Sequence, residues 1–174
     1  MNFFSLYQLP EQFDIDLEQL NKAHKTLVKL THPDRFATAS ERERLMAVQK
    51  NAQVNDGYSV LKSPVSRAEH LLSLRGVELR HEQQTMQDTA FLMQQMEWRE
   101  ALEDMASAPD EQQLTALDAE LVGHINDHMT NMKMALDKNS DDGNQRGADE
   151  IRKLKFMLKL RAEIARLEDT LHEQ

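Results

Sequence analysis

The stretch LVKLTHPDRFATAS at residues 27–40 decides how the first half of this chain folds. It carries the triplet His32-Pro33-Asp34 between two segments that each have the apolar spacing of an amphipathic helix. Pro33 fixes its own φ angle and disfavours helical backbone at His32, so a helix that reaches this point has to end there. Asp34 then places a carboxylate where the chain reverses. The sequence therefore predicts a helical hairpin with a stiff, exposed tip, which we call the HPD loop (His32 to Asp34).

A basic face lies on the helix that precedes the HPD loop. This helix is expected over residues 16–31, with Asp16 as its N-cap. Spacings of three and four residues put three lysines on one side of it: Lys22, Lys25 and Lys29. The opposite, inward side is expected to consist of Leu17, Leu20, His24, Leu27 and Val28. Together with Arg35, the lysines could speed the encounter with an acidic partner, although such a stripe is more often only a solvated face.

The helix that follows the HPD loop is expected over residues 41–61, opened by a capping box that runs from Ser40 to Glu43. Its inward face is expected to consist of Leu45, Val48, Ala52, Tyr58 and Leu61. Shorter helices are expected on either side of the hairpin, over residues 3–9 and 66–74, and Gly76 is a candidate C-cap glycine for the second of these. This unit spans residues 1–76.

The sequence pattern in the second half of the chain predicts a three-helix bundle. Residues 77–87 are polar and unpatterned, and we interpret them as a linker. Three longer helices are expected after it, over residues 88–107, 111–138 and 146–172, separated by Pro109 and by the polar run at 139–144. Because short connections favour antiparallel neighbours, residues 88–174 are expected to form a bundle, and the fold class of the whole chain is all-α.

Composition restricts the possible functions. The chain has no cysteine, which excludes disulfides and thiolate metal ligands. Its net charge is −9, with ten Lys/Arg against nine Asp/Glu in residues 1–75 and eleven against twenty-one in residues 76–174. Nucleic acid is therefore not an expected partner, and the uneven charge suggests two modules with different partners. With neither a signal peptide nor an apolar run of about 20 residues, we expect no membrane association and a cytoplasmic location.

The helix expected over 88–107 carries more apolar surface than a bundle needs. Phe91, Trp98, Leu102 and Met105 cluster on one side at about 100° per residue, as a core face would. A second apolar cluster lies more than 100° away on the helical wheel: Leu92, Met93 and Met96. Acidic residues flank it, among them Glu97, Glu100 and Asp104. An apolar patch with an acidic rim is typical of a protein-binding face, although a helix packed between two neighbours would show the same pattern.

No pattern in the sequence indicates an enzyme, a cofactor or a metal site. The glycines form no phosphate-binding loop, and no nucleophile motif is present. His124 and His128 are spaced like metal ligands on a helix, but the residue after the first is Ile125 and no third ligand is evident, so we interpret both as packing or surface histidines. Phe156 lies at the edge of the apolar stripe of the last helix and could belong either to the core or to the binding patch.

Two sets of sequence segments resemble known protein families. HPDRF at 32–36 and VNDGYSVLKSP at 54–64 resemble the J-domain, although Gly57 stands where that family usually has Ala. MNFFSLYQLP at 1–10, SRAEHLLSLRG at 66–76 and DTAFLMQQMEWREALEDM at 88–105 are similar to the HscB family, the J-type co-chaperones of iron–sulfur cluster assembly. This second resemblance covers essentially the whole chain.

The HscB resemblance implies two partners and no catalysis by the chain itself. A J-domain of this family binds a specialised DnaK-like chaperone (HscA-like) and stimulates its ATPase, and the resemblance assigns that role to the HPD loop, Arg35 and the three lysines. The C-terminal bundle binds the cluster scaffold protein (IscU-like). The residues that match that surface are Leu92, Met93, Met96, Glu97, Glu100, Asp104 and Phe156, with Met96 where Leu is common. The alternatives are a general J-protein for other clients, a metal- or cluster-carrying protein, and an enzyme.

Overall fold

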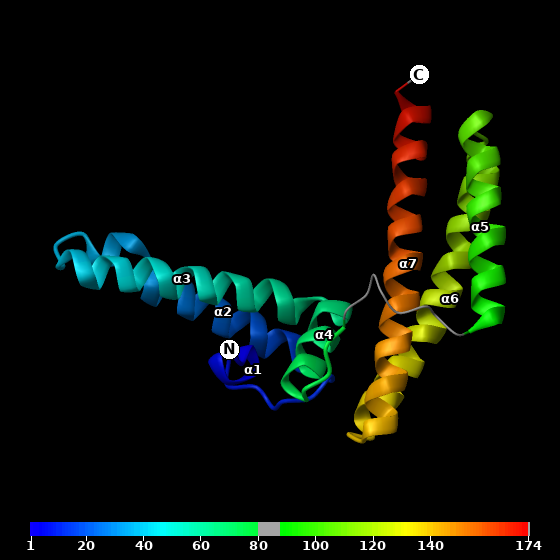
Figure 1. The fold of residues 1–174 in the computed structure, drawn as a ribbon. Helices are drawn as coiled ribbons and strands as arrows, with labels where there is room; N and C mark the ends of the chain where they lie inside the picture. Colours follow the sequence, from blue (N-terminus) through cyan, green and yellow to red (C-terminus); the bar gives the residue numbers. More distant parts are fainter. Residues whose placement is uncertain (80–87, 174) are drawn as a thin grey trace. The chain divides into compact units, whose positions relative to one another are not determined.

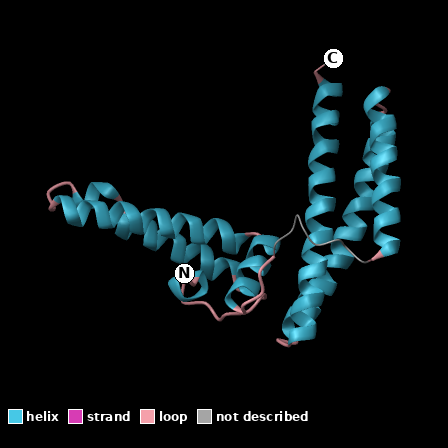
Figure 2. Cartoon of the chain, viewed as in Figure 1, coloured by secondary structure: helices cyan, strands magenta, loops and turns pink. Residues whose placement is uncertain are grey.

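The computed structural model describes residues 1–79 and 88–173, and throughout these residues the regular structure is helical (Figures 1 and 2). The chain divides into two compact units, Met1–Val77 and Glu78–Gln174. The all-α expectation is thus confirmed. Most of the linker expected at 77–87 lies outside the described residues. In the part of the chain that the structure describes, no helix is long and apolar enough to cross a bilayer.

The N-terminal unit is built on an antiparallel hairpin of α2 (Leu17–Thr31) and α3 (Glu41–Lys62), joined by a short 3-10 helix over Pro33–Phe36. Both helices begin as expected. The side chain of Asp16 accepts hydrogen bonds from the backbone N–H groups of Glu18 and Gln19, and that of Ser40 accepts one from Glu43. Figure 1 shows the two helices side by side, with α1 and α4 at the end of the hairpin away from the loop.

Two short helices close that end. α1 covers Phe3–Leu6, shorter than expected, because Gln8 adopts a positive φ of 55° that no helix accommodates. α4 covers Pro64–Leu74 and starts earlier than expected, since proline fits the first turn of a helix. Its Arg67 is buried and donates hydrogen bonds to the carbonyl oxygens of Phe13 (2.7 Å) and Leu61 (2.8 Å). Gly76 has a φ of 81°, which confirms it as the glycine that ends α4.

The inward face expected for α3 is wrong over its first half. Leu45 and Val48 are 59% and 51% exposed, and the buried residues of α3 are Ala47, Val54, Gly57 and Leu61. On α2, Leu17 is likewise exposed, although Leu20 is buried as expected. Near the tip, α3 buries the small side chain of Ala47, and the larger apolar side chains of Leu45, Met46 and Val48 stay exposed.

Gly57 has a packing role that the sequence comparison could not show. A Cβ atom there would lie 2.8 Å from Cδ1 of Phe3 and 3.1 Å from Cε2 of Tyr7. The absence of a side chain therefore lets α1 rest directly on α3, where the hydroxyl of Tyr7 donates a hydrogen bond to the carbonyl oxygen of Val54 (2.5 Å). The contact offsets the helix-propensity cost of glycine, about 1 kcal/mol.

Acidification is expected to destabilise the N-terminal unit through His70. Its Nε2 accepts a hydrogen bond from the backbone N–H of Phe3 (3.1 Å), and its ring packs against Phe4. Burial, and after it the charge of the N-terminal amine, lower the pKa of His70 below its usual 6.5, while Glu11 acts in the opposite direction. Since the unfolded state then binds the proton more readily, the contribution of His70 to stability is complete above about pH 6.5 and is lost as the pH falls through the folded-state pKa.

The measurement is thermal unfolding followed by tyrosine fluorescence between about pH 7.5 and 5.5, for the wild type and for His70→Gln. The wild type should lose stability across this range, and the variant, which has no titratable ring, should lose less. A parallel decline of both proteins would show that other groups cause it.

The C-terminal unit consists of α5 (Thr89–Ser107), α6 (Glu111–Asp137) and α7 (Asp141–His172). α6 and α7 form a long antiparallel pair, and α5 lies alongside (Figure 1). Their shared core contains buried side chains from all three helices, including Trp98, Leu121 and Leu160.

The start expected for α7 at residue 146 is wrong, because the helix begins five residues earlier. Ser140 is its N-cap and accepts a hydrogen bond from the N–H of Gly143 (3.0 Å), and Asp141 and Asp142 lie in the first turn, where negative charge is favourable. The chain reverses at Asn139, whose φ is 45°. A Cβ at Gly143 would collide with the carbonyl oxygen of Ala135, so glycine permits this tight connection.

Candidate functional site

The HPD loop is held by hydrogen bonds among its own residues and Arg35. His32 ends α2 and begins the 3-10 helix, and its Nδ1 accepts a hydrogen bond from the backbone N–H of Asp34 (3.2 Å). The backbone N–H of Arg35 donates to the carbonyl oxygen of His32 (3.0 Å). These bonds fix the peptide, and the carboxylate of Asp34 lies 3.6 Å from Nδ1 of His32 with 93% of its side chain exposed. The loop therefore presents a fixed negative charge to a partner without first having to order itself.

The basic residues lie where the sequence predicted. Lys22, Lys25 and Lys29 are exposed on α2, and Arg35 is exposed directly after the loop. The spacing along the helix puts the lysines on one side, and Lys29 lies in the last turn, where a positive charge is favoured by the helix dipole. The N-terminal unit thus carries a positively charged face on α2, and the exposed carboxylate of Asp34 follows directly after this helix.

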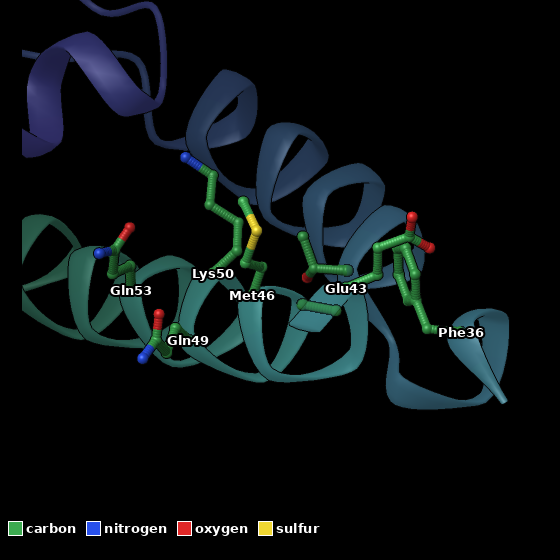
Figure 3. A pocket seen from close by; sticks show the side chains of 8 residues that line it. Phe36, Glu43, Met46, Gln49, Lys50 and Gln53 are labelled. Atoms are coloured by element: carbon green, nitrogen blue, oxygen red, sulfur yellow. The ribbon is translucent and has the colours of Figure 1, made fainter. Parts of the chain in front are cut away.

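A hollow of about 460 Å³ lies next to the HPD loop, and sequence reasoning missed it. It is lined by Thr31, by Phe36 and by one side of α3, where Met46, Lys50 and Gln53 follow one another at helical spacing (Figure 3). Met46 is 58% exposed. The helical spacing of these α3 residues was the available signal, but Leu45, Val48 and Ala52, on a different side of α3, were expected to form its inward face.

α5 has the two faces that its sequence indicates. Phe91, Trp98 and Leu102 are buried, whereas Met105, expected on the same face, is only half-buried. The other cluster is open to solvent, with exposed fractions of 36% for Leu92, 60% for Met93 and 71% for Met96. We call these three residues the exposed patch. The acidic residues Glu97, Glu100 and Asp104 are exposed on the same helix. Since the core of the bundle is complete without the exposed patch, its apolar surface is available to a partner.

Phe156 on α7 belongs partly to the core and partly to the binding patch, the two places expected for it. Its ring is half-buried and packs edge to face against Phe91, with centroids 6.2 Å apart. Its remaining surface lines a hollow of about 420 Å³ together with Met96, Glu100 and Glu103. Phe156 therefore joins the exposed patch from a neighbouring helix.

Arg99 is a further residue of this hollow that sequence reasoning missed. Its Nη1 donates a hydrogen bond to Glu163 on α7 (2.7 Å), and its guanidinium carbon lies 5.9 Å from the ring centre of Phe156. Nothing in the sequence pairs residue 99 with residue 163, because only the packing of α5 on α7 brings them together.

The two bundle histidines have packing partners. His124 contacts the ring of Trp98 edge to face, with centroids 5.1 Å apart, and His128 pairs through Nδ1 with Glu150. Within residues 1–79 and 88–173, no three potential ligands come together in a way that could hold a metal ion.

The helical hairpin with its HPD loop, followed by a separate helical unit, defines a co-chaperone of the J-domain class. Residues 87–165 match the family model described as the HSCB C-terminal oligomerisation domain. The chain is 55% identical over 174 residues to the co-chaperone protein HscB homolog of Pseudoalteromonas atlantica, covering 99% of both chains. The chain therefore belongs to the HscB family of co-chaperones.

Solved structures agree with this assignment. The chaperone HscB from Vibrio cholerae is 45% identical, with a TM-score of 0.85, and the match covers 98% of this chain and 99% of that one. The human co-chaperone protein HscB is 25% identical, with a TM-score of 0.87, over 95% of this chain and 81% of that one. These relatives are co-chaperones rather than enzymes, which agrees with the absence of catalytic motifs from the sequence.

Proposed function

We propose that this protein delivers the scaffold protein of iron–sulfur cluster assembly to a specialised DnaK-like chaperone and stimulates the ATPase of that chaperone. The N-terminal unit, residues 1–76, acts as the J-domain and contacts the chaperone through the HPD loop, Arg35 and the lysines of α2. The C-terminal unit, residues 88–174, binds the scaffold protein. Membership of the HscB family supports this division of roles.

The observation that carries the proposal is the exposure of Leu92, Met93 and Met96 on a helix whose other face buries Phe91, Trp98 and Leu102. With Phe156 and the acidic side chains of α5, the exposed patch forms what we call the scaffold-binding face. Its apolar centre would provide affinity, and its acidic rim would favour a partner with basic residues around a small apolar area.

Because one chain carries both binding faces, it could deliver the scaffold protein to the chaperone without catalysing a reaction. A scaffold protein bound to the C-terminal unit would be held near any chaperone bound to the N-terminal unit. Its effective concentration at the chaperone could reach the millimolar range, as for ligands joined by short linkers. The protein would thus act by bringing two partners together, and no cofactor is needed for that.

The test is the steady-state ATPase rate of the purified HscA-like chaperone, with an IscU-like scaffold protein at a concentration too low to stimulate by itself. Adding this protein should raise the rate, and adding it with the scaffold should raise it far more than either addition alone. If the two additions acted independently, the proposal of delivery would be wrong.

A further inference from the structure

A second hollow, of about 370 Å³, lies between the C-terminal halves of α5 and α7. The buried side chain of Leu102 and the half-buried side chain of Leu167 contribute apolar surface to it, and the exposed, small Ala106 forms part of its wall. Nearby, α7 contributes Leu160 and Ile164 to the buried core. Neither residue lines the second hollow, so the core is complete without it.

The second hollow adjoins the hollow beside Phe156. Arg99 and Glu103 line both of them. The hydrogen bond between Arg99 and Glu163 joins α5 to α7 where the two hollows meet. A partner seated on the scaffold-binding face would therefore reach the second hollow by extending along the same pair of helices.

The second hollow is less acidic than the first, because Arg166 and Arg99 line it beside Glu103 and Glu163. Glu103 borders both hollows, and Glu100 lines the first. Arg99, the cation that lines both, is already bonded to Glu163. Basic residues of a partner would therefore be favoured at the first hollow, whereas the second hollow, where the charges balance, would select mainly for an apolar side chain.

We propose that the scaffold-binding face continues past Phe156 and that the second hollow takes an apolar side chain of the same scaffold protein. This inference rests on the proposed function. It requires that the scaffold protein present two apolar side chains, one for each hollow. Leu102, Ala106 and Leu167 would then determine which scaffold segments fit.

Ala106→Glu tests the proposal because it fills the second hollow without touching the core. The affinity for the metal-free scaffold protein, measured by fluorescence anisotropy of the labelled scaffold, should fall about tenfold. Long-range charge alone would act the other way, since an added carboxylate favours a basic partner. The thermal midpoint and the stimulation of the chaperone without scaffold should not change.

Two comparison variants decide between the outcomes. Ala165→Glu makes the same change at an exposed position of α7 that lines neither hollow, and should leave the affinity unchanged. Replacing Leu92, Met93 and Met96 by Ala tests the first part of the face. If only this triple variant weakens binding, the extension is wrong and the proposed function stands. If neither the triple variant nor Ala106→Glu weakens binding, the proposed function fails, and equal effects of the two Glu variants overturn the extension.

Discussion

Asp34→Asn is expected to abolish the stimulation of the chaperone's ATPase while leaving the affinity for the scaffold protein unchanged. The substitution keeps the shape of the side chain and removes its charge. The carboxylate is almost fully exposed and sits on a backbone fixed by the bond from its own N–H to His32, so its charge is held ready for a cation on the partner. Removing one member of a desolvated charge pair costs about 2–5 kcal/mol, which corresponds to a 30- to 5,000-fold loss of affinity.

The stability of the protein should not change, because asparagine retains the backbone N–H that bonds to His32 and no buried group loses a partner. Asp56→Asn is the matched control: it removes the same charge from an exposed position on α3, away from the loop. The measurements are the chaperone's ATPase rate and the anisotropy of the labelled scaffold. Loss of scaffold binding in parallel with loss of stimulation would contradict the assignment of separate faces.

The sequence predicted the hairpin because its signals are local. Caps at Asp16 and Ser40, the proline after His32 and the glycine at 76 each act within a few residues, and the structure confirms all four. The side of α3 that is buried, by contrast, is not determined by local signals. The first half of this helix carries apolar residues on more than one side, and spacing alone does not decide that Ala47, rather than Leu45 or Val48, is the buried one.

The early start of α7 illustrates a different limit. The run Ser140-Asp141-Asp142-Gly143 suits a turn and suits the first turn of a capped helix equally well. Only the contact with α6 decides between them, because Gly143 has to lie against the carbonyl oxygen of Ala135. The polar composition of 139–144 therefore favoured a longer connection than the three residues that join α6 to α7.

For the candidate sites, the sequence predicted which side chains of one helix are exposed. It did not predict which side chains of two neighbouring helices meet, or the hollows between them. The two faces of α5 follow from periodicity within one helix, and the burial of Phe91 and Trp98 beside the exposure of Met96 agrees with that expectation. Arg99 next to Glu163, and the hollow beyond them, depend on how α5 packs on α7. A single helix pattern contains no information about such pairs.

Replacing Leu92, Met93 and Met96 together by Ala is expected to weaken scaffold binding on the order of 100-fold, or about 2.7 kcal/mol. The three side chains supply the apolar centre of the scaffold-binding face, and alanine removes most of the surface that a partner could bury. The free energy of unfolding should change by less than about 0.5 kcal/mol, because exposed positions contribute little to folding and alanine favours a helix.

Leu121→Ala on α6 is the control in the core of the bundle. Its side chain is 0% exposed and lines neither hollow, so truncation should cost about 2–5 kcal/mol of stability in urea unfolding. The two variants therefore distinguish surface from core: the triple variant should lose affinity at constant stability, whereas Leu121→Ala should lose stability. If the triple variant were destabilised as strongly as the control, Leu92, Met93 and Met96 would belong to the packed core, and the protein would have no separate face for its scaffold.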